Sequence, residues 1–264
     1  MKGESMSRRK RVGGVLFDYG NTLLRYCDFS WDAFGVRVAA AARALAEELK
    51  REGLAGLEYD PDEWAPVWLG RLKQLEETAH RTRVEYDITT AIHDLLAERF
   101  PAVNGRWDAV IDRAVYGIMR QELIAKPGAA PLLWALRQRG LKVGLLSNTQ
   151  FRSRNHLEDL QRDGLMDLLD TWVFSVDVGK RKPDPAIFRL ALEELRTDPE
   201  ETVYVGDNIE CDVEGARAVG LWTILVRTRD NAAVLNPGAD GIIEELEEIP
   251  ALIDAFDAKC DVLE

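Results

Sequence analysis

The stretch Gly14-Val-Leu-Phe-Asp-Tyr-Gly-Asn-Thr-Leu-Leu24 joins a short apolar run to a group of polar and turn-forming residues. The apolar run ends at Asp18, and glycine, asparagine and threonine follow within a few positions. A continuous apolar run of this length is typical of a strand that is buried in a parallel sheet. In open α/β sheets, ligands bind at the edge where the strands end. The stretch therefore predicts that Asp18 is delivered to a ligand-binding edge.

Short apolar runs alternate with helical patterns in the chain beyond residue 126. Strands are predicted at residues 141–146, 171–175, 202–205, 222–226 and 241–243, and helices are predicted between them. This alternation predicts a parallel sheet whose connections are right-handed crossovers. The expected fold class is therefore α/β, with a Rossmann-like parallel sheet core in a three-layer α/β/α arrangement.

The region between residues 27 and 125 shows only helical periodicity, which predicts an inserted all-helical segment. Its apolar residues recur at helical spacing in four stretches, residues 31–51, 61–80, 87–100 and 107–123. The predicted organisation is a core domain of residues 1–26 and 126–264, interrupted by a helical domain of residues 27–125. We expect the chain to cross between them near residues 26–29 and 125–128. Such an insertion places the helical part over the sheet edge where the first strand ends.

The composition of the chain limits its partners. A formal net charge of −12 argues against general binding to nucleic acid or to anionic membranes. No apolar run approaches the length of a membrane span, and the three cysteines are too far apart and odd in number for a disulfide framework (Cys27, Cys211, Cys260). We therefore expect a cytoplasmic protein. The sequence does not predict its oligomeric state. The basic run at residues 7–11 is expected to be a solvated leader.

Polar residues gather where four of the predicted strands and loops end. They are Asp18 with Thr22, Ser147 with Asn148, the lysines of the 178–185 loop, and Asp207 with Asp212. These segments are residues 17–23, 145–149, 182–185 and 205–212. In this order they resemble the four motifs of the haloacid dehalogenase superfamily, most of whose members are magnesium-dependent phosphatases. One such segment would be a weak signal, whereas four in order are a strong one. The helical insertion resembles the cap of that family.

The resemblance implies a role for each acidic residue and agrees with elementary phosphoryl-transfer chemistry. A carboxylate can act as a covalent nucleophile, and the candidate is Asp18, which would carry an aspartyl-phosphate. Mg²⁺ takes one or two protein carboxylates, for which Asp18 and Asp207 are the candidates. The resemblance adds the Gly20 carbonyl as a third ligand. Asp212 is expected behind these ligands, where it would orient Asp207 or a bound water.

The phosphate group itself is expected to be bound by Thr22, Ser147, Asn148 and Lys182. Hydroxyl and backbone donors at a strand end can hold phosphate oxygens, although Ser147-Asn148 alone would be an ordinary turn pair. Lys182 would supply a point charge that stabilises the phosphoryl oxygens and holds the acidic cluster together. The resemblance selects Lys182 because it directly precedes Pro-Asp-Pro, as in the family pattern.

Other conspicuous residues are expected to have structural roles. Lys180 and Arg181 are predicted to be solvated loop charges. The three histidines show no metal-ligand spacing with any cysteine, which favours surface or helix-face positions (His80, His93, His156). The tryptophans of the insertion are expected in its core, although one or two could line a substrate pocket (Trp31, Trp64, Trp68, Trp107). A charged stretch between two of its helices offers candidate substrate contacts (Arg81, Arg83, Tyr86, Asp87).

One position departs from the family pattern. Most phosphatases of this superfamily carry a second aspartate two residues after the nucleophile, where this chain has Gly20. That aspartate protonates the leaving group and then activates water, and such acid–base help is worth a factor of about 10²–10⁴. The leaving group could need little protonation, as in acyl or aryl phosphates. Alternatively, a cap residue or water takes over this role, or the protein is slow or only binds phosphorylated ligands.

The dehalogenase branch of the superfamily is the nearest enzymatic alternative, because it also lacks the second aspartate. It uses no magnesium and would not need Asp207 together with Asp212. Their presence favours a metal and a phosphate. The sequence therefore predicts a Mg²⁺-dependent phosphatase that acts on a small phosphorylated metabolite, with a non-catalytic binding protein or a metal-independent dehalogenase as alternatives.

Overall fold

The computed structural model describes residues 10–25, 30–53, 58–101, 103–121 and 123–261. The predicted crossing at residues 26–29, Cys27 and the first part of the basic run lie outside this part of the chain. Within the described ranges, none of the helices combines the length and the apolar character that crossing a membrane requires.

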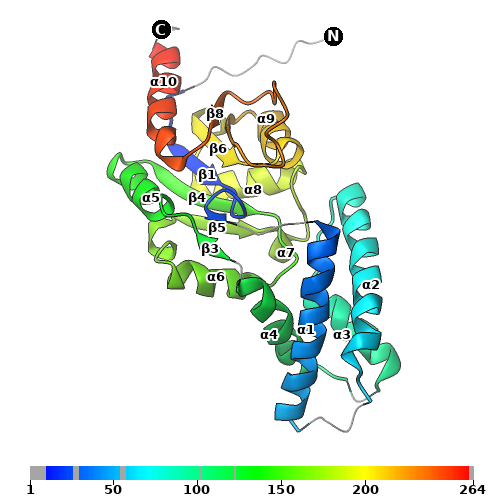
Figure 1. Ribbon diagram of the computed structural model, residues 1–264. Coiled ribbons are helices and arrows are strands. Elements are labelled where there is room, and N and C mark those ends of the chain that lie inside the picture. Colours follow the sequence, from blue (N-terminus) through cyan, green and yellow to red (C-terminus); the bar gives the residue numbers. More distant parts are fainter. Residues whose placement is uncertain (1–9, 26–29, 54–57, 102, 122, 262–264) are drawn as a thin grey trace.

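A sheet of six parallel strands forms the centre of the core, in the order β5-β4-β1-β6-β7-β8 (Figure 1). Its strands are β1 (Gly14–Phe17), β4 (Lys142–Ser147), β5 (Thr171–Phe174), β6 (Thr202–Gly206), β7 (Trp222–Val226) and β8 (Gly241–Ile243). The predicted first strand is central, because β1 pairs with β4 on one side and with β6 on the other. Its side chains are fully buried, as a continuous apolar run predicts.

Helices cover both faces of the sheet, which confirms the predicted three-layer α/β/α core. Val15 and Phe17 of β1 pack into one apolar cluster, and Leu16 between them packs into the other. The first cluster includes side chains of α5 (Ala129–Gln138), α6 (Ser153–Arg162) and α10 (Ile249–Asp261). The second includes side chains of α8 (Pro185–Leu195) and α9 (Gly215–Ala218). Shorter helical turns are α7 (Ser175–Val178), Met166–Leu168, Pro199–Glu201 and Leu246–Glu248.

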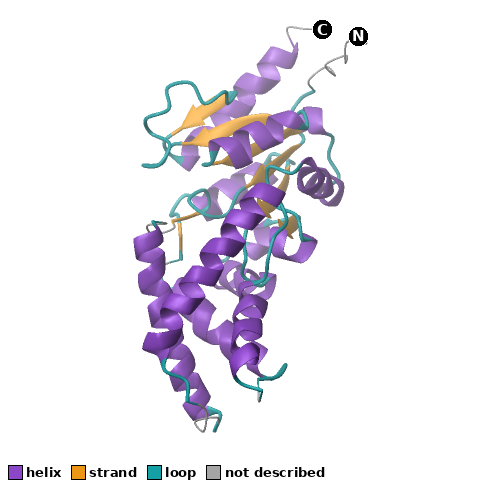
Figure 2. Ribbon diagram, turned by 90° about the vertical axis from the view of Figure 1, so that its right-hand side faces the viewer, coloured by secondary structure: helices purple, strands orange, loops and turns teal. Residues whose placement is uncertain are grey.

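Four helices form a bundle that projects from the sheet (Figures 1 and 2). They are α1 (Trp31–Arg51), α2 (Pro61–Thr82), α3 (Ile88–Arg99) and α4 (Trp107–Arg120). Together with the described residues that connect them, we call these helices the helical segment. Three of them begin where the sequence offers an N-cap, since Ser30, Asp60 and Asp87 each accept a hydrogen bond from a backbone amide of the first turn. The predicted helices are therefore confirmed, with shifts of up to three residues at their ends.

The tryptophans of the helical segment do not all lie in its core. Trp68 and Trp107 are buried as predicted, with 1% and 2% of their surface exposed. Trp64 is partly buried and packs against the same apolar cluster. Trp31 is 42% exposed, because it lies at the start of α1, where the bundle faces the sheet edge.

One local prediction was wrong. Residues 27–125 were expected to be entirely helical, but β3 (Ile124–Ala125) is a strand, which pairs with β2 (Leu24–Arg25) in an antiparallel ribbon where the chain leaves and re-enters the core. Strands of two residues carry no detectable periodicity. The helical stretch after β6 begins with a wider π-helical turn (Ile209–Glu214), which α9 continues.

Candidate active site

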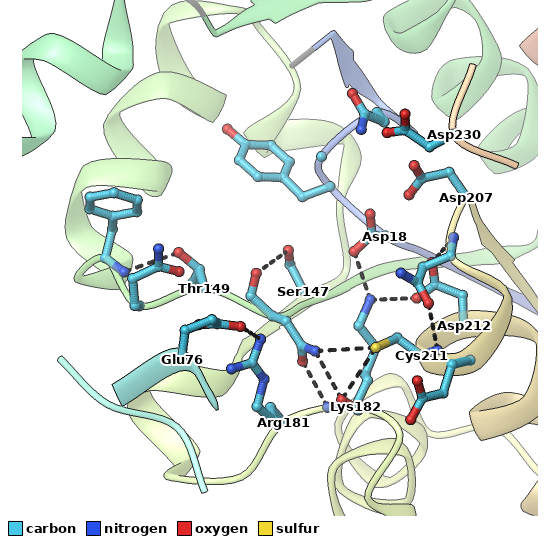
Figure 3. A pocket seen from close by; sticks show the side chains of 18 of the residues that line it. Asp18, Glu76, Ser147, Thr149, Arg181, Lys182, Asp207, Cys211, Asp212 and Asp230 are labelled. Carbon is cyan, nitrogen blue, oxygen red and sulfur yellow. Dashed lines mark hydrogen bonds and ion pairs between the residues drawn. The ribbon is translucent and has the colours of Figure 1, made fainter. Parts of the chain in front are cut away.

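A pocket of about 660 Å³ lies between the helical segment and the carboxyl edge of the sheet (Figure 3). Its core side is formed by the residues that follow β1, β4, β6 and β7, together with the loop that contains Lys182. Its opposite side is formed by residues of the helical segment (Trp31, Phe34, Glu76, Tyr86 and Met119). The polar strand ends predicted from the sequence therefore meet at one cavity.

The ammonium group of Lys182 lies at the centre of the site and is almost completely buried. Lys182 Nζ donates hydrogen bonds of 2.7 Å to Asp18 Oδ1, Asp212 Oδ1 and the Tyr204 hydroxyl. These acceptors match the three protons of an ammonium group. Burial alone would lower the pKa of Lys182, but the carboxylates of Asp18 and Asp212 outweigh it and raise that pKa well above its ordinary value. Lys182 therefore remains charged in spite of its burial.

The close approach of Asp212 depends on a glycine. A Cβ atom at Gly206 would lie 2.3 Å from Asp212 Oδ2, so no other residue fits at the end of β6 without a shift. Asp212 Oδ2 accepts a hydrogen bond of 2.9 Å from the Asn208 amide, which fixes the carboxylate toward Lys182. Asp212 therefore contacts Lys182 directly, in addition to lying beside Asp207.

Three carboxylates crowd at the sheet edge. Asp18, Asp207 and Asp212 each offer an oxygen, and these oxygens lie within 4.8 Å of one another. Burial raises the pKa of Asp207 to about 8, and the charges of Asp18 and Asp212 add to this. Burial also raises the pKa of Asp18 to about 6, with Lys182 opposing the shift and Asp212 adding to it. Hard oxygen donors that repel one another in this way fit a divalent cation such as Mg²⁺.

The turn after β1 brings a backbone carbonyl and an amide side chain to the same place. Gly20 lines the pocket beside Asp18, as expected for a residue whose carbonyl could serve as a metal ligand. Asn21 adopts a left-handed backbone conformation (φ 57°), which asparagine tolerates better than most residues. Its side chain hydrogen-bonds Asp207. The short Gly-Asn sequence therefore links the β1 and β6 ends of the site.

The predicted phosphate-binding residues occupy different positions. Ser147 lines the pocket at the end of β4. The Asn148 side chain also lines it but is bound to the Lys182 backbone: its Nδ2 donates to the Lys182 carbonyl (3.0 Å), and its Oδ1 accepts from the Lys182 amide (2.7 Å). Thr22 is fully buried and does not line the pocket. The structure therefore gathers all the predicted site residues around the pocket except Thr22.

Arg181 and His156 are less exposed than the sequence predicts. Arg181 lines the pocket with 14% of its side chain exposed, and it forms ion pairs with Glu76 (2.9 Å) and Glu85 (3.6 Å) of the helical segment. His156 is 2% exposed. The prediction of a solvated Arg181 was therefore wrong, and of the two positions predicted for His156 the surface one was wrong whereas the helix one is confirmed, because His156 lies on α6 with its side chain covered by partners distant in the sequence. Lys180 is 45% exposed, as predicted.

His156 connects the core with the helical segment through both of its ring nitrogens. Nε2 lies 2.8 Å from Thr149 Oγ1, and Nδ1 lies 3.1 Å from the hydroxyl of Tyr116 on α4. Burial lowers the pKa of His156 to about 3, and the nearby Arg120 charge contributes. The imidazole is therefore neutral near pH 7. Although it lies at the pocket wall, its contacts indicate a structural role.

The structure also corrects the candidate contacts in the helical segment. Of the charged stretch proposed from the sequence, only Tyr86 lines the pocket, and Arg81 and Arg83 do not. Asp87 caps α3 and pairs with Arg152 (2.8 Å). Tyr204 was missed, although a single phenol in the apolar strand 202–206 was a signal for a buried polar group.

Comparisons with known proteins identify the family. A family model described as haloacid dehalogenase-like hydrolase matches residues 12–220. A ribulose-1,5-bisphosphate 5-phosphatase of Halopiger xanaduensis is 27% identical over 250 residues, which cover 90% of this chain and 98% of that protein. A glyceraldehyde 3-phosphate phosphatase of Methanopyrus kandleri is 30% identical over 243 residues, with 89% and 92% covered.

A solved structure shares the fold. The crystal structure of a 2-haloacid dehalogenase from Pseudomonas syringae is 22% identical and aligns with a TM-score of 0.67 over 93% of this chain and 99% of that chain. The family model spans most of the sequence, and the motifs that it covers meet at one pocket. The chain therefore belongs to the haloacid dehalogenase-like hydrolases.

Proposed function

We propose that the protein is a magnesium-dependent phosphatase that hydrolyses a small phosphorylated metabolite through an aspartyl-phosphate on Asp18. The observation that carries this proposal is the contact of the buried Lys182 ammonium with both Asp18 and Asp212, beside the further carboxylate of Asp207. The names of the two relatives, both phosphatases, support the same reaction class.

The contacts of Asp18 suit a nucleophile. Lys182 binds one oxygen of the carboxylate and so orients the group, while the other oxygen attacks phosphorus as the leaving-group oxygen departs on the opposite side. The Ser147 hydroxyl and the Asn148 backbone amide donate to the phosphoryl oxygens, and Lys182, whose three protons are bound by Asp18, Asp212 and Tyr204, stabilises these oxygens through its charge. Water then hydrolyses the aspartyl-phosphate and regenerates Asp18. Thr22 lies outside the pocket lining, so we assign the phosphate contacts to the other three residues.

The proposed metal ligands are Asp18, Asp207 and the Gly20 carbonyl, because these oxygen donors border the pocket together. A divalent cation at this place would neutralise negative charge on the transferring phosphoryl group. Asp212 would stay with Lys182, which already binds one of its oxygens.

The pocket offers few substitutes for the aspartate that is missing at Gly20. His156 is neutral, and both of its ring nitrogens have partners. Of the titratable residues that the described helical segment contributes, Glu76 is paired with Arg181, and burial raises the pKa of Tyr86. A neutral imidazole with both nitrogens occupied and a phenol of raised pKa are poor proton donors for a leaving group near neutral pH. The geometry therefore favours substrates whose leaving group needs little protonation, such as aryl or acyl phosphates.

Hydrolysis of an aryl phosphate in the presence of Mg²⁺ tests this proposal. We expect 4-nitrophenyl phosphate to be hydrolysed, and we expect the rate to vanish in Asp18→Asn and after chelation of the metal. Activity that survives both changes would exclude the mechanism. A protein that hydrolyses nothing but is stabilised by phosphate together with Mg²⁺ would instead be a binding protein. Turnover of a 2-haloacid without metal would identify a dehalogenase.

The proposal includes the organisation and location expected from the sequence. Residues 1–26 and 126–264 would form the catalytic domain, and residues 27–125 would form a helical cap domain. The odd number of widely spaced cysteines supports a reducing, cytoplasmic location.

A further inference from the structure

The pocket is lined by more acidic than basic residues. Among the described lining residues, six carry carboxyl groups (Asp18, Glu76, Asp207, Glu210, Asp212 and Asp230), whereas two carry cations (Arg181 and Lys182). Lys182 donates to three protein acceptors. The proposed cation and Lys182 would serve the phosphate that reacts. Only Arg181 is left, among these residues, to bind a second anionic group of a substrate.

Arg181 is neutralised by the helical segment. Glu76 of α2 lies 2.9 Å from its Nη2 atom, and Figure 3 shows the two side chains directed at each other. Glu85 lies 3.6 Å from Nη1 and does not line the pocket. The Arg181 amide also donates to the Arg83 carbonyl (3.1 Å), which fixes this loop against the helical segment. Glu76 is therefore the carboxylate that masks Arg181 at the pocket.

The wall that faces the catalytic groups is mainly apolar. Trp31, Phe34 and Met119 of the helical segment line it together with Phe151 of the core. Trp31 and Phe34 contact each other edge to face, with ring centroids 5.5 Å apart. Lys73 lies over the Trp31 ring at 5.2 Å, but it does not line the pocket. An uncharged aromatic or aliphatic group fits this wall better than a carboxylate or a second phosphate.

We propose that Glu76 determines specificity by masking Arg181, so that the pocket accepts phosphate monoesters with an uncharged, apolar or aromatic remainder. Substrates with a second anionic group would be rejected, because that group would meet carboxylates and an occupied guanidinium. Rejection by like charge is a common source of selectivity. The inference rests on the proposed phosphatase function and narrows its substrate class.

A pair of ring-matched substrates tests the inference. 4-Carbamoylphenyl phosphate and 4-carboxyphenyl phosphate have nearly the same shape, but only the second carries an extra negative charge. We expect kcat/KM to be at least about tenfold lower for the carboxylated compound, as like-charge repulsion in a partly buried site predicts. In Glu76→Gln the ratio of kcat/KM between the carbamoyl and the carboxylated substrate should fall by a factor of about three or more, because Arg181 becomes available to the substrate carboxylate.

Glu77→Gln provides the matched control. Glu77 is the neighbouring residue on α2, is exposed and does not line the pocket, so the same loss of charge should leave the ratio unchanged. Equal kcat/KM for the two substrates in the wild-type protein would overturn the inference without reference to any variant. An unchanged ratio in a folded Glu76→Gln protein would also overturn it.

Binding separates this inference from the proposed function. The corresponding arylphosphonates, which cannot be hydrolysed, are titrated into the wild-type protein with Mg²⁺ by calorimetry. Tighter binding of the carbamoyl compound without turnover of either phosphate would support the masking and contradict the phosphatase proposal. Turnover of both phosphates without preference, and equal phosphonate affinities, would overturn the masking and leave the phosphatase proposal standing.

Discussion

At the scale of single residues, the Tyr204 hydroxyl connects the site to the sheet. It accepts from Lys182 Nζ (2.7 Å) and donates to the Leu146 carbonyl of β4 (2.8 Å). Tyr204→Phe keeps the ring but leaves both partners short of a hydrogen bond in a fully buried place. We expect the free energy of unfolding to fall by about 1–3 kcal/mol. We also expect kcat for an aryl phosphate to fall about tenfold, because Lys182 is held less firmly.

Tyr59→Phe is the matched control for this prediction. Its hydroxyl also donates to a backbone carbonyl, that of Ala42 (3.2 Å), but it lies within the helical segment. Urea unfolding should show a loss of stability in both variants, whereas only Tyr204→Phe should lose activity. Equal kcat values in the two variants would show that Tyr204 has no effect on the position of Lys182.

His156 predicts a specific dependence of stability on pH. The pKa of His156 is about 3 in the folded protein, whereas its ordinary value, which applies to the unfolded chain, is 6.5. Between pH 3 and pH 6.5 the unfolded chain therefore binds a proton that the folded protein does not bind. Stability therefore rises with pH in this window and is lost as the pH falls below about 6.5.

The variant His156→Gln isolates this contribution, since glutamine can pair with Thr149 and Tyr116 but does not titrate. Between about pH 6.5 and 5, the loss of unfolding free energy should be smaller in the variant by about 1.5 kcal/mol. Urea unfolding at the two pH values measures it. His80→Gln, at an exposed position on α2, should retain the wild-type dependence. Identical pH dependence in all three proteins would contradict a buried neutral His156.

At the scale of elements, Asp87 connects the start of α3 to the core. Its carboxylate accepts from the amides of Thr89 and Thr90 as an N-cap and also pairs with Arg152 of the core (2.8 Å). Asp87→Ala removes both functions, so we expect a loss of unfolding free energy of about 1.5–3 kcal/mol. KM should also rise, because the neighbouring Tyr86 lines the pocket.

Asp60→Ala is the control that separates the two functions of Asp87, helix capping and the ion pair with the core. Asp60 is the N-cap of α2 and accepts from the Asp62 amide, but it is exposed and no core partner is found for it among the described residues. Its loss should cost about 1 kcal/mol and leave KM unchanged. Chemical unfolding and steady-state kinetics on both variants measure the difference. A change of KM in Asp60→Ala as large as in Asp87→Ala would show that KM follows general stability rather than the position of Tyr86.

The same elements show which features can be predicted from sequence. The central strands follow from apolar runs that end in polar residues, because a buried parallel strand has this pattern whatever surrounds it. β2 and β3 could not be predicted, since their pairing joins residues about a hundred positions apart and involves two residues each. The low exposure of Arg181 and His156 could not be predicted for the same reason, because their partners Glu76 and Tyr116 come from the helical segment, far away in the sequence. Local patterns therefore fix the catalytic edge, whereas tertiary contacts decide the opposite wall.

At the scale of the whole molecule, an acidic chain brings three carboxylates together where a cation would relieve their repulsion. The chain has a net charge of −12, and three of its carboxylates lie together at the sheet edge. Binding of a ligand to the folded state alone stabilises it, by about 2.7 kcal/mol at a concentration of 100 times Kd. We therefore expect Mg²⁺ to raise the free energy of unfolding of the wild-type protein.

Asp207→Asn should reverse the order of stability with and without metal. Without metal, the variant removes a partly buried carboxylate that lies within 4.8 Å of Asp18 and Asp212, so we expect it to be more stable than the wild type by about 1–3 kcal/mol. With Mg²⁺ the wild type should gain stability and the variant should gain little, because it lacks a proposed ligand. Asp230→Asn removes an exposed carboxylate from the same pocket and should change stability by less than about 0.5 kcal/mol while keeping the Mg²⁺ response. Thermal unfolding of the three proteins with EDTA and with Mg²⁺ measures both effects. If Asp207→Asn is less stable than the wild type in EDTA, the crowded carboxylates do not repel one another enough to serve as a site that a cation completes.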